Sequence, residues 1–78
     1  MDKLQKDFMD GLAEIFEVQV AELEPESQLE SFDWDSLAIV SSVVLIKDLY
    51  GIEIKGDILA EQVTVADLME LVTARSKI

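Results

Sequence analysis

The chain has 78 residues, which is enough for one small domain, and below about 80 residues a single core seldom contributes more than a few kcal/mol. Its 17 acidic and 6 basic residues give a net charge of −11, which disfavours binding to nucleic acid or anionic lipid and predicts partners with basic patches. The chain lacks histidine and cysteine, and with them the usual general base and the usual thiolate metal site. We therefore expect a non-catalytic protein in a reducing, cytoplasmic setting.

No segment reaches the roughly 18 consecutive apolar residues of a membrane span. The best candidate is interrupted by Ser41, Ser42, Lys47 and Asp48. Residues 1–7 also lack the basic start and apolar block of a secretory signal. We expect a soluble monomer with one domain over residues 1–78.

The first predicted element is a helix over residues 3 to 17. Its apolar residues recur every three or four positions and form one stripe, made of Leu4, Phe8, Leu12, Ile15 and Phe16. From Val18 to Asp35 the periodicity lapses and Pro25 lies among acids, which predicts a long loop of the kind that is often functional. Four apolar residues are expected to anchor this loop to the core: Val20, Leu23, Leu29 and Phe32.

A second helix is predicted to begin at Asp35 or Ser36 and to end near Tyr50, where Gly51 can take a positive φ. A strand is less consistent with this segment, which is long and lacks strict alternation. The inward side of the helix can use Val40, Val43, Ile46 and Tyr50. We expect a second stripe to face outward and to select partners by apolar contact, and it consists of Ala38, Ser41, Leu45 and Leu49.

Two further helices are predicted in the last third of the chain. Asp57 can cap a short third helix that carries Ile58 and Leu59. The segment 64–67 resembles a capping box and starts a fourth helix. The buried side of this helix is predicted to consist of Leu68, Met69, Leu71 and Val72. Arg75 and Lys77 lie near its negative end, where cations are favoured. The fold class is therefore all-α, a small four-helix bundle with three main helices and one short one.

Ser36 is the candidate functional residue, because it opens the second helix after an acidic loop. A phosphate attached there lies near unpaired amides and the positive end of the helix dipole. A serine at this place can also be an ordinary helix cap. A calcium loop starting at Asp33 and Asp35 is excluded, since Leu37 and Val44 stand where ligands are needed.

The order of these elements resembles the acyl carrier proteins over nearly the whole chain. The resemblance rests on Asp35-Ser36-Leu37 at the start of the second helix, the segment 50–54 at its end, and Val63-Thr64-Val65 before the last helix. It implies a 4′-phosphopantetheine arm on Ser36, installed from coenzyme A by a separate phosphopantetheinyl transferase. It also implies that Asp35 and Leu37 contact this synthase, and that partner enzymes load and remove the acyl group.

The chain departs from the usual pattern of that family around its motif. Asp33 stands where glycine is common, and Asp tolerates positive φ better than most residues. Ala38, Ser41 and Lys47 stand where acids are common, which favours a specialised acyl carrier whose partners dock through basic or apolar patches. The adjacent Trp34 either packs partly against the core or contacts a partner.

Two alternatives remain open at this point. An aminoacyl or peptidyl carrier, loaded by an adenylating enzyme, would use the same arm on Ser36. A helical interaction module would carry no arm, and Ser36 would only cap the helix. Identifying the thioester carried in cells would distinguish an aminoacyl carrier from an acyl carrier. The intact mass of the native protein would distinguish an unmodified interaction module from a carrier, because only a carrier bears the arm.

Overall fold

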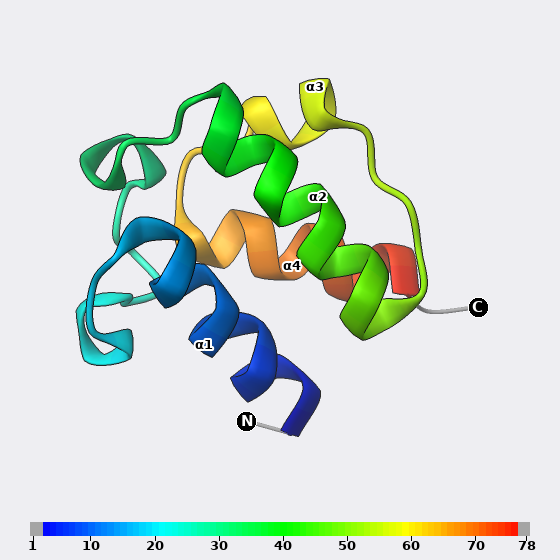
Figure 1. Ribbon diagram of the computed structural model, residues 1–78, viewed down its shortest axis with the longest axis horizontal. Helices are drawn as coiled ribbons and strands as arrows, with labels where there is room; N and C mark the ends of the chain where they lie inside the picture. Colours follow the sequence, from blue (N-terminus) through cyan, green and yellow to red (C-terminus); the bar gives the residue numbers. More distant parts are fainter. Residues whose placement is uncertain (1–2, 77–78) are drawn as a thin grey trace.

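The helices of this protein fold around one core, as the computed structural model shows for residues 3–76, the part of the chain that it describes (Figure 1). The elements in chain order are α1 (Lys3–Phe16), η1 (Val20–Glu22), η2 (Leu29–Phe32), α2 (Ser36–Tyr50), α3 (Gly56–Ala60) and α4 (Val65–Ser76), where η marks a 3₁₀ turn. The predicted all-α bundle with one short helix is confirmed. No helix in the described part is both long enough and apolar enough to cross a membrane.

Every helix and the long loop contribute to the core. Its fully buried side chains are Phe8, Leu12, Leu29, Ile46, Ile54, Leu59, Leu68 and Val72. Helices α1 and α2 approach closely at Gly11, where a Cβ atom would lie 2.7 Å from the Leu45 methyl carbons. Glycine at this position therefore lets the Leu45 side chain pack directly onto the α1 backbone.

Helix α4 begins with the predicted capping box. The Asp67 carboxylate accepts from the Thr64 amide at 3.2 Å, and the Thr64 hydroxyl accepts from the Asp67 amide at 3.1 Å. Arg75 lies in the last turn as expected, whereas Lys77 lies outside the described residues. The third helix begins two residues earlier than predicted, at Gly56 with Lys55 as its cap, so Asp57 lies within its first turn and is not its cap.

The long loop is fixed to the start of α4 by backbone hydrogen bonds. The Leu29 amide donates to the Val63 carbonyl at 2.8 Å, and the Val65 amide donates to the Ser27 carbonyl at 3.0 Å. Leu23 and Leu29 are buried and Phe32 is half-buried, as predicted for loop anchors. The prediction was wrong for Val20, which is 44% exposed at the start of η1.

The orientation of α2 agrees with the prediction in part, since Ile46 is buried and Val43 and Tyr50 are half-buried, but it differs at Val40 and at the second stripe. Ala38 is only 6% exposed, whereas Val40, which we expected to face inward, is 59% exposed. Leu45 and Leu49 are half-buried against the core, and Ser41 is half-buried. The stripe expected to face outward instead faces the protein, because α1 packs against α2 on that side at Gly11.

Candidate cofactor-attachment site

The loop reaches Ser36 through a tight turn at Asp33. Asp33 has φ 60° and ψ 59°, the left-handed conformation, and its carbonyl accepts from the Asp35 amide at 2.8 Å. This confirms the expectation that an aspartate can hold the positive φ for which glycine is usual. A non-glycine residue in this region stores about 1–3 kcal/mol of strain, and the surrounding contacts must offset it.

Asp35 is the cap of α2. Its backbone is extended, its Oδ1 accepts from the Ala38 amide at 2.9 Å, and its carbonyl accepts from the Ile39 amide at 2.9 Å. Ser36 is therefore the first residue inside the helix, and its side chain is exposed without a hydrogen bond to any described residue. The interpretation of Ser36 as an ordinary cap is wrong, since Asp35 fills that role.

The first turn of α2 provides a favourable place for an anion. The amides of Ser36 and Leu37 have no acceptor among the described residues, because Asp35 occupies only those of Ala38 and Ile39. Free amides and the positive end of the dipole together favour a phosphate group attached at this turn. The Ser36 hydroxyl thus fits the attachment of a phosphodiester.

Trp34 packs inward. Its Nε1 donates to the Leu59 carbonyl at 3.2 Å, and its ring meets Phe16 edge-on with centroids 5.8 Å apart. Phe16 in turn stacks on Phe32 with centroids 5.2 Å apart. Trp34 therefore ties the loop before Ser36 to both α1 and α3, which favours the core interpretation of this half-buried residue over a partner contact.

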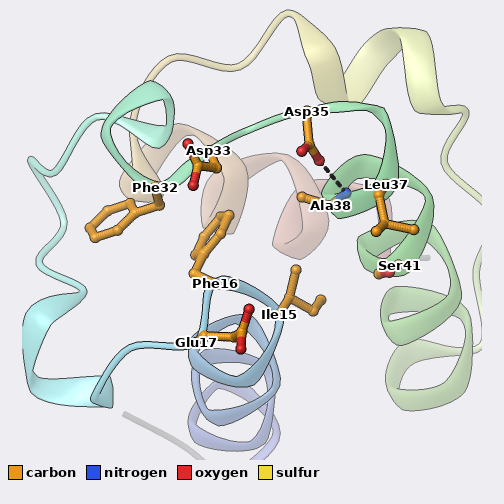
Figure 2. Close-up of a pocket in the computed structure, with 9 residues that line it drawn as sticks. All are labelled: Ile15, Phe16, Glu17, Phe32, Asp33, Asp35, Leu37, Ala38 and Ser41. Atoms are coloured by element: carbon orange, nitrogen blue, oxygen red, sulfur yellow. Dashed lines mark hydrogen bonds between the residues drawn. The ribbon is translucent and has the colours of Figure 1, made fainter.

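A pocket of about 230 Å³ lies between the end of α1, η2 and the start of α2. Figure 2 shows its side chains around a common space, with Ile15, Phe16 and Glu17 from α1 and its end, Phe32 and Asp33 from the loop, and Asp35, Leu37, Ala38 and Ser41 from α2. The lining combines apolar side chains with three carboxylates, those of Glu17, Asp33 and Asp35. The sequence gives no sign of this pocket, because it joins three separate segments.

The exposed face of α2 carries three apolar side chains, of which Val40 had been predicted to face inward. Leu37 is 75% exposed, Val40 59% and Val44 54%. Their spacing of three and four residues places them on one side of the helix. This face replaces the predicted stripe of Ala38, Ser41, Leu45 and Leu49 as the accessible apolar surface beside Ser36.

Comparison with known proteins shows which family the chain belongs to. Residues 6–72 match the family model described as a phosphopantetheine attachment site, and this span contains the whole site described above. The chain belongs to the acyl carrier protein family. The acyl carrier protein of Thermobifida fusca is 38% identical over 73 residues, covering 87% of this chain and 92% of that protein.

Two mycobacterial carriers are also similar to this chain. The meromycolate extension acyl carrier protein of Mycolicibacterium smegmatis is 36% identical over 74 residues, covering 88% of this chain and 75% of that protein. The protein of the same name from Mycolicibacterium aurum is 37% identical over 70 residues, covering 83% and 72%. The chain is an acyl carrier of fatty-acid or specialised lipid biosynthesis, and its cofactor is 4′-phosphopantetheine.

The residues around Ser36 fit this cofactor. The two free amides suit the phosphodiester, and the exposed hydroxyl suits the covalent bond. When attached, the cofactor supplies a thiol that holds the acyl group as a thioester. The chain contributes the attachment point, the positive end of the α2 dipole and the surfaces that its partner enzymes contact. Because the chain has no cysteine, it has no thiol of its own that could attack the thioester.

Proposed function

We propose that Ser36 carries the 4′-phosphopantetheine arm of this acyl carrier. The observation that carries the proposal is the exposed hydroxyl at the first residue of α2, beside two amides that lack acceptors. In the transfer, the serine oxygen forms a bond to the phosphorus next to pantetheine. The pyrophosphate bond of coenzyme A breaks, adenosine 3′,5′-bisphosphate leaves, and a base of the transferase takes the serine proton.

We assign the contacts with the transferase to Asp35 and Leu37. The Asp35 cap uses Oδ1, so Oδ2 can accept from a basic group of the transferase. Leu37 is 75% exposed next to the serine and can enter an apolar recess of that enzyme. Both residues are held by the first turn of α2, so their positions relative to the Ser36 hydroxyl are fixed.

The docking face for loading and transferring enzymes is the exposed apolar side of α2, made of Leu37, Val40 and Val44. These three aliphatic side chains suit an apolar recess on the partner enzyme, and the net charge of −11 suits a basic rim around that recess. Lys47, which pairs with Glu53 at 3.3 Å, follows this face along α2 and breaks the run of acids. We propose that this pattern selects specialised partners.

The cargo is proposed to be an acyl chain in a specialised extension pathway. The similar proteins are named acyl carrier proteins, and those of Mycolicibacterium are named for meromycolate extension. These names favour an acyl cargo over an aminoacyl one, and identification of the thioester in cells separates the two. We propose a cytoplasmic setting, because the transfer consumes coenzyme A.

The attachment is tested with unmodified protein, coenzyme A, magnesium and a broad-specificity phosphopantetheinyl transferase. Intact mass should show one added arm on the wild type and none on Ser36→Ala. Ser31→Ala is the matched control, since Ser31 is also an exposed serine and its hydroxyl is engaged with the Gln28 carbonyl at 2.6 Å. Modification of Ser36→Ala would contradict the assignment.

A further inference from the structure

The pocket between α1 and α2 is lined by residues on both sides of the proposed attachment residue in the chain, although Ser36 itself does not line it. Asp35 and Leu37, the two chain neighbours of Ser36, both line it. An arm that leaves the Ser36 hydroxyl therefore starts beside two residues of the pocket wall. None of the carrier functions described above uses the far wall of the pocket, which is made of Ile15, Phe16 and Glu17.

The lining matches the chemistry of the first half of a pantetheine arm. After its phosphodiester, the arm carries two geminal methyl groups, one hydroxyl and an amide. Ile15, Phe16 and Phe32 offer an apolar surface for the methyl groups. The carboxylates of Glu17 and Asp33 can accept from the hydroxyl and the amide N–H, and the Ser41 hydroxyl can donate to the amide carbonyl.

Charge and size limit what can occupy the pocket. Glu17, Asp33 and Asp35 disfavour an anionic group, so the phosphodiester stays at the free amides of α2 while a neutral segment enters. The volume of about 230 Å³ is below the roughly 300–1,000 Å³ of pockets that enclose drug-sized ligands. The pocket therefore accommodates a segment of the arm and is too small to enclose a long acyl chain.

We propose that this pocket is the docking site for the pantoyl segment of the arm, held between Leu37 and Phe16. The inference rests on the proposed attachment at Ser36. Docking there directs the arm from Leu37 toward α1, away from Val40 and Val44, and leaves these two side chains of the exposed face free for partner enzymes. The docked arm is thus a resting state, which a partner releases when it takes the thiol.

The test uses ¹³C,¹⁵N-labelled protein carrying an unlabelled arm, with intact mass first confirming one arm at Ser36. Isotope-filtered NMR should show nuclear Overhauser contacts from the geminal methyl groups to the Phe16 ring and the Ile15 methyls. Conversion from unmodified to modified protein should shift the signals of Phe16 and Ser41 more than those of Val43. Contacts to Val43 or Ile54 instead, or arm signals as sharp as those of free pantetheine, would overturn the docking site.

Two variants and their controls sharpen this test. Ser41→Leu fills the pocket and should abolish the contacts to Phe16, whereas Val40→Leu, on the exposed side of α2, should retain them. Leu37→Ala removes one wall at an exposed position where misfolding is not expected, and should weaken the contacts, with Val44→Ala as its control. Full contacts in Leu37→Ala would count against the site even if Ser41→Leu failed to fold.

The outcomes also separate the two proposals. A mass without an arm, or with an arm on another residue, refutes the attachment at Ser36 and the docking site together. An arm on Ser36 that makes no contact with the pocket refutes the docking site alone.

Discussion

Asp35 and Ser36 are adjacent, yet the structure gives them different contributions to stability. The Asp35 carboxylate accepts from the Ala38 amide at 2.9 Å and caps α2, whereas the Ser36 side chain is exposed. Loss of an N-cap side chain costs about 1 kcal/mol, within a range of roughly 0.5–2. For a domain of this size, 1 kcal/mol corresponds to a fall of about 4–8 °C in melting temperature. Asp35→Ala should therefore melt about 4–8 °C below the wild type.

Two further variants separate the hydrogen bond from the charge. Asp35→Asn keeps a good cap and loses only the charge at the helix dipole, so it should lie between Asp35→Ala and the wild type. Ser36→Ala removes no cap and places a better helix former inside α2, so its free energy of unfolding should change by less than about 0.5 kcal/mol.

The assay is thermal and urea unfolding of the unmodified proteins, followed by circular dichroism. Salt at about 0.15 M limits the influence of the charge change, since the screening length is then about 8 Å. If Ser36→Ala lost as much stability as Asp35→Ala, Ser36 would be a cap after all. The separation of a structural aspartate from a free serine would then be wrong.

Three other results are expected. Added salt or divalent cations should raise the melting temperature, because a net charge of −11 is self-repelling, and a flat response would contradict this. Leu45→Glu should unfold the protein, since Leu45 packs on Gly11. Val44→Glu should fold normally and accept the arm, but its acyl group should be transferred poorly to or from the cognate enzyme. Equal unfolding of both variants would refute the orientation of α2. Trp34→Phe should lose about 1 kcal/mol in urea unfolding with its bond to the Leu59 carbonyl, and unchanged stability would show that this bond contributes nothing.

The features that could be predicted from the sequence are those fixed by neighbouring residues. The caps at Asp35 and Thr64 depend on side chains within three residues of the amides they bind, and the end of α2 depends on the positive φ of Gly51 alone. The predicted start of α3 was wrong by two residues, because its cap has no such signal. Lys55 occupies its cap position without a side-chain hydrogen bond, so no local signal marks it.

The features that could not be predicted depend on how distant segments meet. Trp34 reaches the Leu59 carbonyl, 25 residues along the chain, and no spacing rule indicates that bond. The pocket beside Ser36 joins the end of α1, the loop and α2, so its lining cannot be read from any one element. Composition predicts an acidic surface, but it cannot show that Glu17 and Asp33 line the same pocket.

The orientation of α2 shows why two apolar stripes on one helix leave the docking face undetermined. Periodicity alone did not show that both stripes contribute to the core, Ile46 from the first and Ala38 from the second, because both have spacings of three and four residues. The second stripe is covered by α1, where Gly11 lacks the side chain that would keep Leu45 away. Once Leu45 packs there, the 3.6-residue repeat turns Leu37, Val40 and Val44 toward solvent, next to the serine that receives the arm. A glycine on the first helix thus determines which side chains of the second are available to partner enzymes.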